Sequence, residues 1–158
     1  MHLIVGASGT AGGRIARRLV NRGDPVRVVS RDVSRLELLR SLGAVPIQGD
    51  LRSTEWMPAA LEGVRTVLLT SHGLVPPTRD NHPGLIDDLG NRRMIDAALQ
   101  AGVEHILFIS VAPVAGQRAT LFTALKHRVE DHLKSRGIGY TVNKADSIHR
   151  DARFASAG

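Results

Sequence analysis

The chain contains no cysteine, few aromatic residues and no long apolar run, and each absence excludes a class of function. Without cysteine there are no disulfides, no thiolate metal ligands and no cysteine nucleophile. Aromatic residues make up only 3% of the 158 residues, so platforms for stacking single-stranded bases are nearly absent. No apolar stretch approaches the ~20 residues that cross a membrane. The first one breaks at Gly6, unlike a signal peptide. We therefore expect a cytoplasmic protein without a membrane partner.

Basic residues are unevenly distributed along the chain. The formal net charge is +6, and eight arginines lie between Arg14 and Arg40. A basic half suits a nucleic acid or a phosphate-bearing small ligand, and a solvated arginine-rich surface has the same composition. No run of five Lys or Arg residues occurs and aromatic residues are scarce, so nucleic acid is the least favoured partner. The hydrophobic fraction of 42% and the charged fraction of 23% are typical of one globular domain.

Apolar segments with strand and helix patterns alternate along the chain. The strand-like segments are 3–5, 26–30, 45–48, 66–70, 105–110 and 140–142, and the helix-like segments are 12–21, 33–42, 55–61, 85–101 and 119–136. This alternation predicts right-handed crossovers and a three-layer, doubly wound α/β domain with a mostly parallel sheet, the Rossmann type. Segments 66–70 and 105–110 are apolar on both faces, as expected of parallel strands covered by helices on each side.

Two loops follow strands at the edge where open α/β sheets bind ligands, 72–84 and 112–118. The first is too long for a simple connector, so it is either a lid over the ligand or a surface loop.

Glycines recur three residues apart in GASGTAGG, between the first strand and the first helix. In this context Gly6 allows a sharp turn, Gly9 lets the backbone approach a pyrophosphate, and Gly12 lets the helix pack close to the sheet. The amides at the start of the helix then face the phosphates, aided by the helix dipole. The segment therefore predicts a dinucleotide site, and a tight turn without a ligand is the alternative.

The end of the second strand, VRVVSRD, indicates which dinucleotide is bound. NAD-specific sites tend to place an acid there for the ribose 2′-hydroxyl, but this chain has Ser30 followed by Arg31. A guanidinium binds a 2′-phosphate in a forked manner, and Arg35 in the next helix is placed to add to that pocket. Asp32 follows two residues after Ser30 and could still reach a ribose hydroxyl, which would favour NAD(H). The alternative role for Asp32 is to cap the next helix, for which Ser34 is also a candidate. We expect NADP(H), with NAD(H) as the alternative.

Other polar residues carry less specific signals. Asp50 in QGDL either accepts a hydrogen bond from the adenine amino group or serves a turn or cap. The seven histidines lack the spacing of metal ligands, so we expect no metal site. Ser8 in GASGT is not in the context of a hydrolase nucleophile elbow, which argues against hydrolase chemistry.

Five segments follow one another in a specific order: GASGTAGG, VRVVSRD, GDL, NRRMIDAALQAGVEHILFIS and KHRVEDHLKSRGIGYT. This succession, over residues 1–142, resembles the NmrA-like, atypical branch of the short-chain dehydrogenase/reductase superfamily. The resemblance implies an NAD(P)-binding Rossmann domain. It also implies these cofactor contacts: Gly6, Ser8, Gly9, Thr10, Ala11 and Gly12 around the pyrophosphate, Arg31 at the 2′-phosphate, Asp50 and Leu51 at the adenine, and Thr70, Ser71 and His72 along the middle of the cofactor.

One departure from this superfamily concerns catalysis. Its working enzymes use a serine after the fifth strand and a Tyr-x-x-x-Lys motif on the next helix, where the tyrosine transfers the proton. Ser110 and Lys126 occupy the serine and lysine positions, but Phe122 stands in place of the tyrosine. The single tyrosine, Tyr140, lies on the last expected strand. The resemblance therefore implies weak or absent catalysis, although relatives that transfer hydride without the tyrosine keep activity open.

A second departure lies at residues 143–158. Relatives continue with a Leu-Arg-Pro-like segment and a substrate-binding lobe, whereas this sequence reads NKADSIHRDARFASAG. We expect a Rossmann domain at 1–142 followed by a loose or locally helical tail at 143–158 that lacks the lobe.

Two functions of different classes follow from these departures. The first is an NAD(P)-binding protein of the oxidoreductase type, and the second is a non-catalytic NADP(H)-sensing regulator that acts through a protein partner. A homodimer stays open as well, because in the superfamily the helix equivalent to 119–136 often joins subunits.

Overall fold

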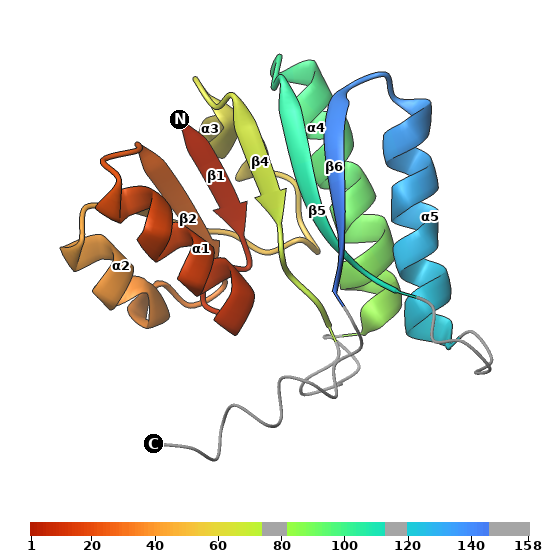
Figure 1. Cartoon of the computed structure of the whole chain (residues 1–158), viewed down its shortest axis with the longest axis horizontal. Coiled ribbons are helices and arrows are strands. Elements are labelled where there is room, and N and C mark those ends of the chain that lie inside the picture. Colours follow the sequence, from red (N-terminus) through yellow and green to blue (C-terminus); the bar gives the residue numbers. More distant parts are fainter. Residues whose placement is uncertain (74–81, 113–119, 146–158) are drawn as a thin grey trace.

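A computed structural model describes residues 1–73, 82–112 and 120–145 (Figure 1). Its strands form one parallel sheet in the order β3-β2-β1-β4-β5-β6. The elements are β1 (His2–Val5), α1 (Thr10–Asn21), β2 (Val26–Ser30), the 3-10 helix η1 (Val33–Leu36), α2 (Glu37–Ser41), β3 (Val45–Gln48), α3 (Met57–Leu61), β4 (Thr66–Leu69), the π-helix η2 (Gly84–Gly90), α4 (Asn91–Gln100), β5 (His105–Val111), α5 (Leu121–Ser135) and β6 (Gly139–Ala145).

The strand order reverses beside β1. The chain moves outward from β1 to β2 and β3, then returns past β1 to continue with β4, β5 and β6. The carboxyl ends of β1 and β4 therefore flank the switch point, where open α/β sheets bind their ligands. The doubly wound Rossmann fold expected from the sequence is confirmed.

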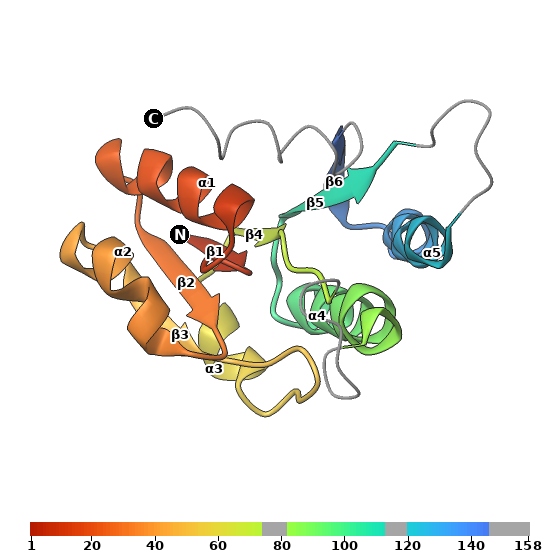
Figure 2. The same cartoon turned by 90° about the horizontal axis from the view of Figure 1, so that it is seen from below.

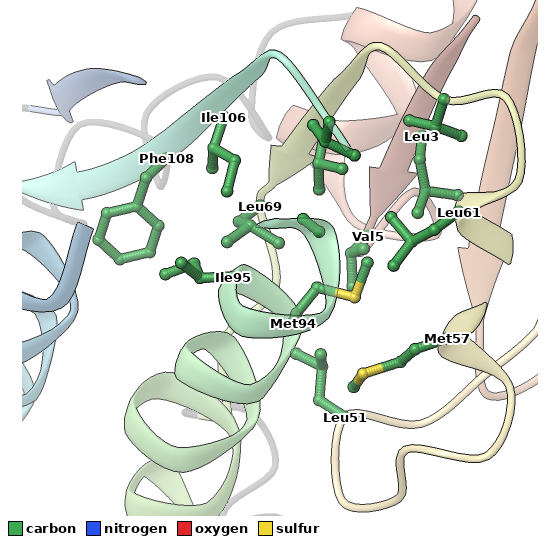
Figure 3. Packing of buried hydrophobic residues seen from close by; sticks show 14 of the residues in the cluster. Leu3, Val5, Leu51, Met57, Leu61, Leu69, Met94, Ile95, Ile106 and Phe108 are labelled. Atoms are coloured by element: carbon green, nitrogen blue, oxygen red, sulfur yellow. The ribbon is translucent and has the colours of Figure 1, made fainter. Parts of the chain in front are cut away.

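Helices cover both faces of the sheet, and β1 shows how the sequence achieves this. Leu3 and Val5 are buried in a core shared with α3, α4 and α5, whereas Ile4 is buried in a second core with α1 and α2. Figure 2 shows α1 on one side of the sheet and α4 on the other. Figure 3 shows the first core, in which side chains from β1, β4 and β5 meet α3 and α4. The three expected layers are therefore present.

Strand β5 is less covered than its sequence predicts. Ile106 and Phe108 are fully buried, but Leu107 and Ile109 on the opposite face are only half-buried among the described residues. The reason is the placement of the helices on that side, because α1 packs on β1 and β2 and α2 packs on β3. Leu107 still packs against the core shared with α1 and α2, so among the described residues this face of β5 is covered in part, less fully than expected.

The helix expected at 85–101 consists of two different helices. Its first part is the π-helix η2, and the α-helical part starts at Asn91. The side-chain amide of Asn91 donates to the carbonyls of Ile86 and Asp87, at 2.9 and 3.2 Å, and so stabilises the wide turns. Gly90 lies so close to the chain after β3 that a Cβ there would stand 2.7 Å from the Leu51 Cβ. Such wide turns are rare and are frequently found at functional sites.

Two other boundaries differ from the sequence prediction. The helix expected at 33–42 begins as η1, capped by Asp32, and becomes α-helical only at Glu37. Strand β6 continues to Ala145, so the first three residues of the expected tail are paired with β5. Residues 146–158 lie outside the described part.

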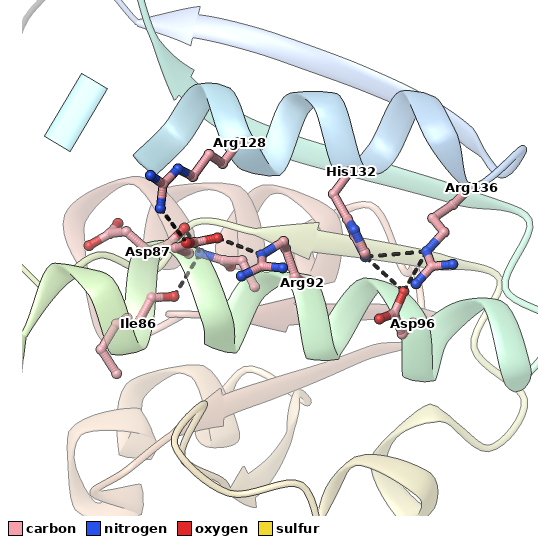
Figure 4. A network of polar contacts seen from close by, with 9 residues as sticks. Ile86, Asp87, Arg92, Asp96, Arg128, His132 and Arg136 are labelled. Atoms are coloured by element: carbon pink, nitrogen blue, oxygen red, sulfur yellow. Dashed lines mark hydrogen bonds and ion pairs between the residues drawn. The ribbon is translucent and has the colours of Figure 1, made fainter. Parts of the chain in front are cut away.

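Ion pairs join η2 and α4 to α5 (Figure 4). Asp88 of η2 lies 2.5 Å from the Arg92 guanidinium and 3.5 Å from that of Arg128. Further along, Asp96 of α4 lies 2.8 Å from both His132 and Arg136. Acidic groups of η2 and α4 therefore face basic groups of α5 and of the residue that follows it.

The glycine turn brings three segments of the chain into contact. Gly6 ends β1 with a φ of +92°, and a Cβ on it would stand 2.7 Å from the Ser71 amide nitrogen. A Cβ on Gly12 would stand 2.5 Å from the Gly6 carbonyl oxygen and 2.6 Å from the Thr70 hydroxyl. Only glycine at both positions lets α1 approach β1 and the end of β4 this closely.

Gly12 and Gly13 give a matched test of this packing within one helix. We expect Gly12→Ala to lower the free energy of unfolding by about 1–3 kcal/mol or more, because its Cβ would overlap backbone. Gly13→Ala places a Cβ 3.1 Å from the Ala7 carbonyl oxygen. We expect Gly13→Ala to lower the free energy of unfolding less than Gly12→Ala, because the higher helix propensity of alanine, about 1 kcal/mol, offsets the cost of that contact. Urea denaturation of both variants measures the difference, and equal free energies of unfolding would contradict the packing.

Candidate functional site

A cavity of about 520 Å³ opens at the carboxyl ends of β1, β2 and β4. This volume is within the ordinary range for small-molecule and cofactor sites. Ten residues predicted for the cofactor line it: Gly6, Ser8, Gly9, Arg31, Arg35, Asp50, Leu51, Thr70, Ser71 and His72.

Three predicted residues do not line the cavity. Thr10 and Ala11 start α1 with exposed side chains, and Gly12 is buried under Gly6. Gly12 therefore has the packing role that its position in the motif predicts.

The sequence prediction missed several lining residues. Val5 is the last residue of β1, Val29 is the last but one of β2, and Gly49 precedes Asp50. Their positions next to predicted residues in the sequence were the available signal. Ile86 comes from η2, and no local signal in the sequence connects it to the glycine turn.

The segment that follows β2 presents two arginines to the cavity, and one oxygen of its carboxylate, at Asp32, is used in a helix cap. Arg31 and Arg35 both line the cavity. The carboxylate of Asp32 accepts hydrogen bonds from the amide and the hydroxyl of Ser34, at 3.0 and 2.6 Å, which cap η1. These bonds hold the pKa of Asp32 below its ordinary value. The capping role considered for Asp32 is confirmed, although its residue also borders the cavity.

Ser30 links this end of β2 to the glycine turn. Its hydroxyl donates to the Ser8 hydroxyl at 3.2 Å and accepts from the Asp32 amide at the same distance. The buried Ser30 therefore holds the glycine turn and the segment after β2 together at the edge of the cavity.

Asp50 is engaged by a neighbour in its own loop. Its carboxylate accepts hydrogen bonds from the backbone amide and the guanidinium of Arg52, both at 2.9 Å. Burial alone would raise the pKa of Asp50, but the bonds from Arg52 outweigh it and lower the pKa. Trp56 donates from its indole nitrogen to the Asp50 carbonyl at 2.8 Å and packs on Gly49, so the loop is fixed beside the cavity.

The segment after β4 forms the opposite wall. Thr70 donates its hydroxyl to the Val5 carbonyl at 2.9 Å and so ties β4 to β1. The buried Ser71 hydroxyl has no hydrogen-bond partner among the described residues. Desolvation lowers the pKa of the His72 imidazole; Asp87 counteracts this and Lys126 adds to it.

Ser110 lies inside the protein and does not line the cavity. It is 1% exposed, and its hydroxyl donates to a carboxylate oxygen of Glu130 at 2.6 Å. The other oxygen of Glu130 lies 3.3 Å from the Lys144 ammonium on β6. The hydroxyl at the serine position is therefore engaged by Glu130 of α5, and Lys144 of β6 pairs with the other oxygen of that carboxylate.

Lys126 is also buried and outside the cavity lining. Its ammonium lies 2.9 Å from the Asp87 carboxylate and 4.9 and 5.4 Å from the ring centroids of Phe108 and Phe122. Burial lowers the pKa of Lys126, and the Asp87 carboxylate counteracts this. The structure therefore does not bring Ser110 and Lys126 together around the cavity.

The described residues fit a dinucleotide. Gly6 and Gly9 leave the loop without side chains where a pyrophosphate would approach, and α1 starts directly behind them. Arg31 and Arg35 supply positive charge at one end of the cavity, and the Ser71 hydroxyl supplies a polar group without a partner at the other.

Other classes of site find no support in the described part of the chain. No group of three metal-ligating side chains is found there. None of its helices combines the length and the apolar character needed to span a bilayer. Most of the loops 72–84 and 112–118, including the lid considered above, lies outside the described residues.

Comparisons with known proteins agree with this site. A family described as NAD(P)H-binding matches residues 6–152. The photosystem II assembly factor Ycf39 of Cyanophora paradoxa is 32% identical over 142 residues, which cover 90% of this chain and 44% of that protein. The NmrA-like family domain-containing oxidoreductase notA of Aspergillus sp. (strain MF297-2) is 33% identical over 147 residues, 88% of this chain and 43% of that protein. The chain thus spans less than half the length of these relatives.

A solved structure gives the same fold. Citrobacter sp. triphenylmethane reductase complexed with NADP(H) superposes with a TM-score of 0.73 at 24% identity, over 91% of this chain and 49% of that one. The glycine turn, the switch-point cavity and these similarities agree, and the chain belongs to the NAD(P)H-binding family, with an NmrA-like oxidoreductase among its homologues.

Proposed function

We propose that the chain binds NADP(H) in preference to NAD(H), and that it catalyses oxidoreduction weakly or not at all. The observation that supports the preference is the charge at the end of β2. Arg31 and Arg35 border the cavity there, while the carboxylate of Asp32 is bonded to Ser34. A 2′-phosphate gains charge-assisted hydrogen bonds from a guanidinium, whereas NAD-specific sites use a carboxylate that accepts a hydrogen bond from the ribose 2′-hydroxyl.

A titration of NADPH and NADH tests this preference. We expect Arg31→Ala to weaken NADPH about 10- to 100-fold, since it removes hydrogen bonds to a charged group, and to leave NADH within about twofold. Arg40→Ala is the matched control, because Arg40 pairs with Glu37 on the surface of α2 and does not line the cavity. Isothermal calorimetry measures both ligands on all three proteins.

Two results would contradict the proposal. Equal losses of NADPH and NADH in Arg31→Ala would mean that Arg31 does not distinguish the 2′-phosphate. A wild-type chain that binds neither nucleotide at millimolar concentration would mean that the glycine turn serves only the architecture.

Weak or absent catalysis is supported by the three positions of the expected proton-transfer group. Phe122 has no ionisable group, the Ser110 hydroxyl donates a hydrogen bond to Glu130, and the Lys126 ammonium is paired with Asp87. The hydroxyl at position 110 then contributes to stability, which can be measured without a substrate.

We expect Ser110→Ala to lower the free energy of unfolding by about 1–3 kcal/mol, because the buried Glu130 carboxylate loses a hydrogen-bond donor. Ser135→Ala is the control, since its exposed hydroxyl donates only to the nearby His132 carbonyl. It is expected to change stability by less than about 0.5 kcal/mol. Equal effects of the two substitutions would show that Ser110 is not held by Glu130.

The same observations favour a second function, a non-catalytic NADP(H) sensor that acts through a protein partner or a second copy of the chain. A sensor needs the cavity but not the proton-transfer group. We expect no NADPH oxidation with a panel of aldehydes and quinones, either by the wild type or by Phe122→Tyr, since Ser110 and Lys126 stay engaged elsewhere. NADPH-dependent turnover by the wild type, followed by absorbance at 340 nm, would rule out the sensor.

A further inference from the structure

Asp87 and Lys126 form an ion pair inside the protein, and both residues also bond to the chain after β4. Their side chains are 0% and 4% exposed, respectively. The Lys126 ammonium donates to the Ser71 carbonyl at 3.3 Å, and the second carboxylate oxygen of Asp87 accepts from the Gly73 amide at 2.8 Å. One charged pair therefore holds two backbone groups that are two residues apart.

This segment is a wall of the cavity. Ser71 and His72 line it, whereas Lys126 and Asp87 do not. The pair therefore acts on the wall from within the protein. Its residues come from η2 and α5, which are joined by the further ion pair of Asp88 with Arg128.

The position of the wall relates it to one half of a dinucleotide. When a dinucleotide binds to a doubly wound sheet, each half of the dinucleotide lies over one half of the sheet, on either side of the switch point. The proposed 2′-phosphate contact at Arg31 places the adenosine half over β1 to β3. Ser71 and His72 at the end of β4 then belong to the nicotinamide half.

We propose that Asp87 and Lys126 are positioning residues that shape the nicotinamide half of the cavity by fixing Ser71 and Gly73, and that Lys126 does not touch the cofactor. This inference rests on the proposed binding of NADP(H). It differs from the superfamily's arrangement, in which the lysine holds the nicotinamide ribose. In this chain Asp87 binds the ammonium, and the Phe108 and Phe122 rings flank it.

The pair is tested by removing both charges at once. Asp87→Asn with Lys126→Met leaves no lone buried charge, which a single Lys126→Met would leave. The probes are NADPH and 2′,5′-ADP, which lacks the nicotinamide half. We expect the double variant to bind NADPH about tenfold more weakly, since the wall is no longer preorganised, and 2′,5′-ADP within about twofold of the wild type.

A matched control removes a pair between α4 and α5. Asp96→Asn with His132→Gln breaks a contact of 2.8 Å whose residues do not line the cavity. We expect it to leave the binding of both probes unchanged. Losses of both probes in the Asp87/Lys126 variant, or of neither, would overturn the positioning role.

Lysine reactivity of the wild type supplies a measurement that does not depend on a variant. Lys134 and Lys144 have side chains that are 54% and 46% exposed, against 4% for Lys126. Acetylation followed by peptide mass mapping should therefore modify Lys126 far more slowly than Lys134, both with and without NADPH. A Lys126 that reacts as fast as Lys134 and is protected by NADPH would overturn the inference.

The failure of this inference can be told from the failure of the proposed function. If the wild type binds neither NADPH nor 2′,5′-ADP, the proposed function fails and the positioning role fails with it. If the wild type binds both and the Asp87/Lys126 variant binds them equally well, only the positioning role fails.

Discussion

The close approach of backbone at Gly6 and Gly12 is the constraint on which the rest of the site depends. Because neither residue carries a side chain, α1 sits directly on the end of β1, and Thr70 bonds across to the Val5 carbonyl. β1 and β4 pair directly, and the turn sets how closely α1 approaches the ends of these two strands. Gly6, Gly9 and Thr70 all line the cavity, so this close approach shapes the cavity wall at the switch point.

Polar groups in the structure are divided between two tasks. At the cavity, Arg31 and Arg35 come from the segment that follows β2, beside a carboxylate used as a cap. On the other half of the sheet, the two buried charged groups of α5 bond inside the protein, Lys126 to Asp87 and Glu130 to Ser110. The half that would carry chemistry in an oxidoreductase is thus the half in which the ionisable groups are paired with one another.

The sequence predicted the features that arise from local patterns. Alternating strands and helices gave the layers and the parallel sheet, and the spacing of Gly6, Gly9 and Gly12 located the cavity. The features that it did not predict depend on contacts between distant segments. Gly90 of η2 lies so close to Leu51, far away in the chain, that no Cβ fits between them, and Ile86 of the same helix lines the cavity.

Burial of the catalytic candidates belongs to the same class of distant contacts. The local sequence around Lys126 does not show that its ammonium meets Asp87, because their pairing requires η2 and α5 to lie side by side. The position of Phe122 was readable from the sequence, but its place beside that ammonium was not.

The central place of β1 has a consequence for the order in which the protein folds. His2–Val5 precedes the other strands of this sheet in the chain, and β2 follows it closely and pairs with one of its edges. The other edge of β1 pairs with Thr66–Leu69, which comes much later in the chain. The two halves of the sheet are therefore joined by contacts between residues far apart in sequence. Such contacts make folding slow. A ribosome-bound chain that stops before β4 displays an open, apolar strand edge, the kind of surface that chaperones protect from aggregation.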